Sequence, residues 1–150
     1  LLLGARWVSL QPDPELAAAA QGALARVAST LPADARLALE TSGLMVPRPP
    51  ASAPPESWLP ALRHAIRAER KVALDYRDAG GQATRRLVWP FAMAFFEHSR
   101  LIVAWCELRQ AFRHFRADRV LHLQATDEPL PERRHQLIRR WKAHMRFGAV

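Results

Sequence analysis

The sequence predicts an α+β fold in which a small antiparallel β-barrel or sandwich is preceded and followed by helices. Short apolar runs separated by brief turns occupy residues 71–124 and indicate several antiparallel strands. An alanine-dense segment at residues 17–28 predicts a helix before the strands. Leu137, Trp141 and Met145 lie four residues apart, which predicts a helix after them.

Residues 1–46 are expected to form a helical connector. Asp13 is a candidate N-cap, and Pro14 suits the first helical position because its missing N–H costs nothing there. Further helices are expected at 1–10 and 32–40, with a short strand at 44–46. Residues 47–57 then form a proline-rich linker, since such a segment stays extended and semi-rigid. Its alternative role, as a ligand of SH3-type domains, is less common.

Residues 58–127 are predicted to be the main domain. A helix capped by Ser57 places Trp58, Leu62 and Ile66 on one face. The strand at 71–77 alternates apolar and polar residues, and the glycines at 80 and 81 predict a hairpin turn after it. Further strands are expected at 84–89, 91–96, 100–107, 112–117 and 120–124. We expect Pro90 to bend the sheet, and residues 128–150 to form a basic C-terminal helix.

The composition favours an anionic partner. The chain has 150 residues, with Lys+Arg 22 against Asp+Glu 14, which gives a formal net charge of +8. A basic surface attracts nucleic acid, nucleotides or anionic lipid, although a GC-rich coding bias toward arginine and alanine explains part of the excess. The single cysteine, Cys106, cannot form an intrachain disulfide, so we expect a cytoplasmic protein.

Two further expectations concern the context of the chain. No apolar run reaches the roughly 18 residues that a membrane-spanning helix needs. The sequence begins with Leu1 and shows no secretory signal, so we expect it to be a piece of a longer protein.

Basic and aromatic residues alternate in segment 112–119, which holds the main ligand-site candidates. These are Arg113, His114, Arg116 and Arg119, with Phe112 and Phe115 between them. Strict strand alternation places Arg113 and Phe115 on one face and His114 and Arg116 on the other, so the cations cannot all occupy one pocket. Arg116 or Arg119 has an alternative role as an ion-pair partner of Asp118, Asp75 or Glu107.

Three candidates come from the preceding hairpin. Arg85 and Arg86 lie on opposite faces of their strand, and the sequence does not decide which of them faces a ligand groove. Tyr76 is suited either to stacking on a base or to packing in the core. Trp89 and Trp105 are expected in the core, and Cys106 is expected to be a buried, unreactive thiol.

The order of these segments resembles the WYL domain of bacterial transcriptional regulators, in particular the YafY-like group. The resemblance covers residues 58–124 and rests on Val72–Tyr76, Arg85–Pro90, Leu101–Cys106 and the Arg-x-Phe-Arg-x-Asp-Arg pattern at 113–119. The Trp-Tyr-Leu triplet that names the family corresponds to Arg100, Leu101 and Ile102 here, so both aromatic residues are absent.

The resemblance implies an Sm-like or SH3-like β-barrel that binds a ligand and forms homodimers. Residues 1–46 are similar to the helical, dimerising connector that follows the helix-turn-helix of such regulators, and that DNA-reading part is absent from this chain. The ligands implied are single-stranded nucleic acid or a nucleotide, with promoter DNA bound through the missing helix-turn-helix.

No pattern in the sequence indicates catalysis. The six histidines lack metal-ligand spacing, and there is no glycine-rich phosphate loop or nucleophile–base arrangement, so neither an enzyme nor a metal or cofactor is expected. The leading hypothesis is an effector-sensing, dimerising region whose anionic ligand is held by Tyr76, Arg85, Arg86, Arg113, His114, Arg116 and Arg119. The alternative is an interaction module with a solvated basic surface. For the C-terminal helix, dimer packing is favoured over a nucleic-acid arm or a membrane-surface helix.

Overall fold

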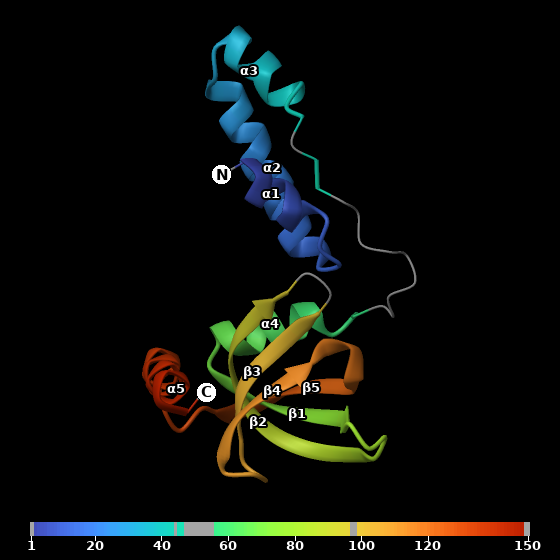
Figure 1. The fold of residues 1–150 in the computed structure, drawn as a ribbon, viewed down its shortest axis with the longest axis vertical. Coiled ribbons are helices and arrows are strands. Elements are labelled where there is room, and N and C mark those ends of the chain that lie inside the picture. Colours follow the sequence, from blue (N-terminus) through green and yellow to red (C-terminus); the bar gives the residue numbers. More distant parts are fainter. Residues whose placement is uncertain (1, 44, 47–55, 97–98, 149–150) are drawn as a thin grey trace. The chain divides into compact units, whose positions relative to one another are not determined.

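The computed structural model describes residues 2–43, 45, 46, 56–96 and 99–148 (Figure 1). The chain divides into two compact units, Leu1–Pro60 and Ala61–Val150. The linker predicted at 47–57 lies largely outside the described residues, as does the segment between the strands predicted at 91–96 and 100–107. None of the described helices is both long and apolar enough to cross a membrane.

The first unit contains the helices α1 (Leu2–Ser9), α2 (Pro14–Thr30) and α3 (Ala33–Glu40). The predicted cap of α2 is confirmed: Asp13 precedes Pro14, and its carboxylate accepts a hydrogen bond from the Leu16 amide at 3.2 Å. Met45 and Val46 are not in a strand, contrary to the expectation for 44–46. None of the three helices contains a buried residue.

The second unit is built on a five-stranded antiparallel sheet with the order β4-β3-β2-β1-β5. Its strands are β1 (Arg70–Arg77), β2 (Ala83–Phe95), β3 (Arg100–Cys106), β4 (Ala111–Arg116) and β5 (Val120–Pro129). The 3₁₀ turn η1 (Ala117–Arg119) joins β4 to β5, while α4 (Leu59–Arg67) and α5 (Arg134–Gly148) flank the sheet in sequence. The α+β class is therefore confirmed.

The hairpin between β1 and β2 forms where the glycines predict it. Gly81 adopts a positive φ of 83°, and the Asp78 side chain accepts a hydrogen bond from the Gln82 amide. The two strands expected at 84–89 and 91–96 are one long strand, β2. Its register with β3 shifts between Pro90 and Ala92, so the proline bends the strand without ending it.

The pairing of the described strands gives an open sheet, whereas a barrel was expected. β4 and β5 are its edges, yet the sheet curves strongly (Figure 1). Tyr76 in β1 and Phe115 in β4 belong to strands separated by β2 and β3, but their ring centroids are only 5.1 Å apart. This contact defines a concave inner face.

Each face of the sheet has its own apolar core. The inner face carries the buried residues Val72, Leu74, Tyr76, Val88, Ile102, Ala104, Cys106, Phe115 and Leu123. The outer face is covered in part by α5, where Leu137 packs with Phe91 and Val103 and none of the three is more than 1% exposed. Half-buried Trp89, Phe112 and Trp141 surround this second core.

Candidate functional site

The seven predicted ligand residues do not converge on one hollow. The strand registers place Tyr76, Arg86 and Arg113 on the inner face, and Arg85, His114 and Arg116 on the outer face. Arg119 lies in η1, beyond the end of β4. The alternation predicted for segment 112–116 is therefore observed, and it separates the cations of β4.

The outer-face arginines are already neutralised. Both Nε and Nη2 of Arg116 donate to the Asp118 carboxylate, at 3.0 and 2.8 Å. This pair lowers the pKa of Asp118 and raises that of Arg116. Arg85 lies opposite Asp75 in the β1–β2 ladder, with 3.7 Å between Nη1 and Oδ1. Arg116 thus has the ion-pair role that was the alternative in its sequence interpretation.

His114 serves as a hydrogen-bond acceptor on the outer face. Its Nε2 accepts from the indole N–H of Trp141 in α5 at 3.2 Å. Although part of the ring remains exposed, its burial against the protein lowers the pKa of His114. Because a neutral Nε2 is occupied by a donor, this imidazole fastens α5 to the sheet and is poorly suited to hold an anion.

Arg86 differs from the other cations because it is buried without an acidic partner. Only 9% of the surface of Arg86 is exposed. Nε donates to the Thr84 hydroxyl at 3.1 Å, and Nη1 lies 4.0 Å from the Cys106 sulfur. No carboxylate among the described residues pairs with it. Since no fully buried side-chain nitrogen in the described part lacks a partner, the remaining Nη2 reaches solvent.

Tyr76 belongs to the core at its ring and to the backbone network at its hydroxyl. The hydroxyl oxygen accepts from the Arg116 amide at 3.2 Å, and the ring packs edge-on against Phe115. Arg113 is exposed on the edge strand and Arg119 is half-buried. Neither makes a hydrogen bond or ion pair with a described residue, so both guanidinium groups remain available to an anion.

An aromatic row on the outer face is the main feature that sequence reasoning missed. Trp89, Trp105 and Phe112 lie opposite one another on β2, β3 and β4, and each is half-buried. Arg140 of α5 stacks above the row, with its guanidinium carbon 5.1 Å from the Trp105 ring and 5.5 Å from the Phe112 ring. The alternation of side chains along each strand was the available signal for this shared face, but the sequence analysis assigned both tryptophans to the core.

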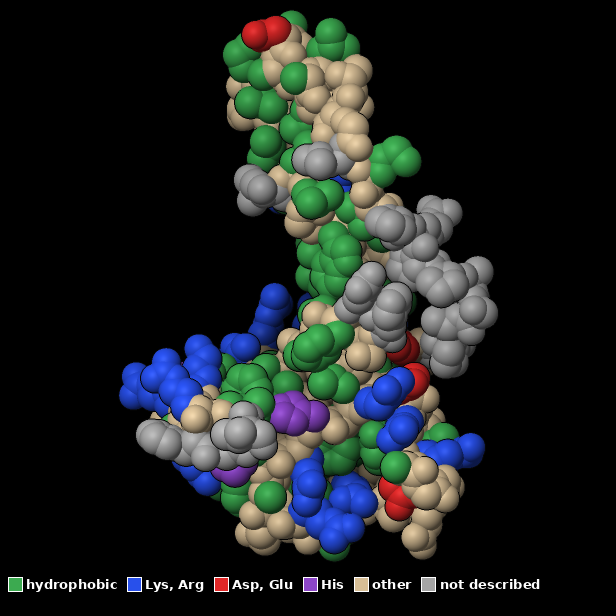
Figure 2. Space-filling view, in the orientation of Figure 1, with side chains coloured by type: hydrophobic (Ala, Val, Ile, Leu, Met, Phe, Trp, Pro, Cys, Tyr) green, Lys and Arg blue, Asp and Glu red, His purple; other side chains and the backbone are tan. Residues whose placement is uncertain are grey.

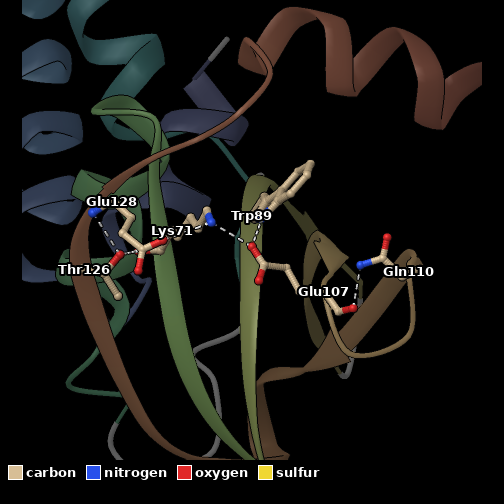
Figure 3. Close-up of polar contacts among 6 residues, drawn as sticks. All are labelled: Lys71, Trp89, Glu107, Gln110, Thr126 and Glu128. Atoms are coloured by element: carbon tan, nitrogen blue, oxygen red, sulfur yellow. Dashed lines mark hydrogen bonds and ion pairs between the residues drawn. The ribbon is translucent and has the colours of Figure 1, made fainter.

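A polar cluster at the end of the same face ties four strands together (Figure 3). Lys71 of β1 donates to Glu107 at 2.8 Å and to Glu128 of β5 at 3.0 Å. The indole N–H of Trp89 in β2 also donates to Glu107, which directly follows β3, at 2.7 Å. These bonds raise the pKa of Lys71 and lower that of Glu107. All its charges are satisfied internally, so the cluster is structural.

The residues present hold no evident metal site. No group of three or more His, Cys, Asp or Glu side chains comes together in the described part of the chain. The arrangement offers cations and hydrogen-bond donors; Arg86 and Arg113 lack an acidic partner there, whereas Arg119 interacts electrostatically with Asp118.

Comparison with known proteins gives a family match and a similar solved structure. A solved structure of proteasome accessory factor B/C (PafBC) of Arthrobacter aurescens is similar, with 29% sequence identity and a TM-score of 0.49. The similarity covers 65% of this chain but only 14% of that chain. No match was found among curated proteins. Residues 57–125 match the model of the WYL domain family.

Proposed function

We propose that this chain is the sensing part of a transcription regulator and that its WYL domain binds an anionic ligand, single-stranded nucleic acid or a nucleotide. The observation that carries the proposal is Arg86. A buried charge is costly unless it is paired, because the protein interior solvates it poorly. A phosphate reaching the solvent-accessible Nη2 would supply the missing counter-charge.

Arg113 and Arg119 are the secondary candidates. Neither forms an ion pair within hydrogen-bond distance of a described residue, although Arg119 interacts electrostatically with Asp118, so neither has to give up such a pair in order to bind phosphate. Arg85, His114 and Arg116 are weaker candidates, because each already has a partner in the ligand-free protein. This proposal assigns ligand binding to a subset of the residues predicted from sequence.

The dimerising role is supported by the first unit. Its helices bury none of their own residues, yet they expose Leu3, Trp7 and Leu37. Helices without a buried side chain cannot offset their conformational entropy alone, so a covering partner is needed. A second copy of the chain fits the expectation of a homodimer, and light scattering on the whole chain at several concentrations tests it.

The ligand proposal is tested with an adjacent pair of variants. Arg86→Met removes the buried cation, whereas Arg85→Met removes an exposed cation on the opposite face. Binding of a fluorescein-labelled single-stranded oligonucleotide and of ATP is measured by anisotropy and calorimetry. We expect Arg86→Met to weaken binding at least 10-fold, the scale of one lost charge-assisted hydrogen bond, and Arg85→Met to leave it within about 2-fold. Equal effects of the two variants would reject Arg86 as the anchor.

A further inference from the structure

Helix α5 presents different chemistry on its two sides. Leu137, Ile138 and Trp141 face the sheet and complete the outer core. Arg139, Lys142 and Arg146 are all exposed and follow one another at intervals of three and four residues. At about 100° per residue, these three side chains fall within an arc of about 60°. We call them the α5 basic stripe.

The stripe carries uncompensated charge. None of its three members makes a hydrogen bond or an ion pair with a described residue, and residues 133–150 contain no Asp or Glu. The acidic residue just before the helix, Glu132, pairs with Arg140 on another side of α5. Figure 2 shows Lys and Arg side chains gathered over α5, with no acidic side chain among them in this view.

Three kinds of occupant are poorly matched to this surface. A membrane-surface helix must insert its apolar side, but that side of α5 is already packed against the sheet. A protein partner needs several apolar anchors, and Met145 is the one exposed large apolar side chain beside the stripe among the described side chains of α5. Single-stranded nucleic acid needs aromatic platforms for its bases, and no described stripe residue is aromatic.

We propose that the α5 basic stripe binds the phosphate backbone of duplex DNA without reading its sequence. From Arg139 to Arg146 the helix rises about 10 Å, over which a duplex presents several phosphates at one charge per about 1.7 Å of its axis. The stripe is held at a fixed orientation, because Trp141 bonds to His114 and Leu137 is fully buried. This contact is additional to the ligand site proposed around Arg86, which lies on the inner face.

The test uses the whole chain and a fluorescein-labelled 20-base-pair duplex of mixed sequence, followed by anisotropy. Three phosphate contacts predict that the affinity falls about 40-fold when salt rises from 50 to 200 mM. The stripe variant combines Arg139→Gln, Lys142→Gln and Arg146→Gln. We expect it to bind at least about 10-fold more weakly at 50 mM salt and to lose most of this salt dependence.

The matched control removes the same charge elsewhere. It combines Arg67→Gln, Arg77→Gln and Arg109→Gln, which are exposed and have no described ion-pair partner. We expect the control to keep the wild-type affinity within about 3-fold, since loss of net charge alone acts weakly and at long range. All six positions are exposed, and a thermal unfolding scan verifies that both variants fold.

Four outcomes would overturn the inference. The first is that the wild-type chain does not bind the duplex at 50 mM salt, and the second is that the stripe and control variants weaken duplex binding equally. The third is that a single strand of equal length binds more tightly than the duplex and does so through the stripe. The fourth is that vesicles containing anionic lipid bind through the stripe. Arg86→Met is measured in parallel. If this variant binds the duplex as the wild type does but no longer binds the single strand, the Arg86 site and the α5 basic stripe act separately. Failure of one proposal is then distinguishable from failure of the other.

Discussion

Replacing Arg86 by methionine should make the ligand-free protein more stable. The substitution removes one charge-assisted hydrogen bond to Thr84, worth about 1.5–3 kcal/mol, and a weak contact at 4.0 Å from a sulfur atom. It also removes the desolvation penalty of a guanidinium in a residue that is 9% exposed, which is several kcal/mol. Methionine keeps most of the apolar stem, so we expect a net gain of about 1–2 kcal/mol.

Urea unfolding followed by circular dichroism measures this difference. The midpoint should move to higher urea while the slope with denaturant stays constant, which shows that only stability has changed. Arg85→Met is the control: its ion pair with Asp75 is exposed and long, so its effect should stay within about 0.5 kcal/mol. Thr84 retains a partner in the variant, because its hydroxyl also donates to the Tyr76 carbonyl.

A ligand narrows this difference in stability. At an ATP concentration 100 times the wild-type dissociation constant, the wild-type chain should gain about 2.7 kcal/mol, and a variant that binds 10-fold more weakly only about 1.4 kcal/mol. If Arg86→Met instead lowers the stability by more than about 1 kcal/mol without ligand, the guanidinium is structurally compensated. The physical reason for an anion at this position would then disappear.

Three other contacts make testable predictions. Glu107→Gln should lower the free energy of unfolding by about 1 kcal/mol at pH 7. The lowered pKa of Glu107 means that its contribution is present above the ordinary value of 4.5 and is lost as the pH falls through the lowered value, so the difference from wild type should vanish in acid unfolding curves. For His114, a lowered pKa means that stability declines as the pH falls below the ordinary 6.5. Protonated Nε2 cannot accept from Trp141, so the NMR signal of that indole N–H should shift as the pH falls below 6.5 through the lowered pKa of His114, whereas in His114→Gln it should not. Arg140→Gln should lose about 1 kcal/mol of stability through its stacking on the aromatic row and its pair with Glu132, and the neighbouring Arg139→Gln almost none; equal losses would contradict both contacts.

Local signals in the sequence predicted most of the secondary structure. Asp13 followed by Pro14 marked the start of α2, and the glycines at 80 and 81 marked the hairpin, because in both cases the deciding interactions lie within a few residues. Alternation also placed Arg113 and Phe115 on one face. These features need no knowledge of the rest of the chain.

Long-range features were missed because they depend on how the sheet curves and what covers it. Alternation showed that Arg85 and Arg86 oppose each other, but only the curvature that brings Tyr76 to Phe115 decides which of the two is buried. Trp89 and Trp105 resemble core residues in composition, yet α5 covers their face only in part. Pro90 was expected to bend the sheet, but the sequence does not show that a register shift keeps β2 continuous past it.

The +8 net charge predicts an affinity for polyanions, but the charges have three different fates in the structure. Some cations, such as Arg116, hold a carboxylate at hydrogen-bond distance, and an incoming phosphate would have to displace it. Arg140 is occupied by the aromatic rings beneath it. Cations without a described ion-pair partner can bind an anion with no competing loss, and they include the buried Arg86 and the exposed α5 basic stripe. Because Arg86 is buried, its interaction with an anion should be strong and weakly screened by salt. Because the α5 basic stripe is exposed, its affinity for DNA should fall as salt rises, so varying the ionic strength alone should separate ligand sensing from DNA contact.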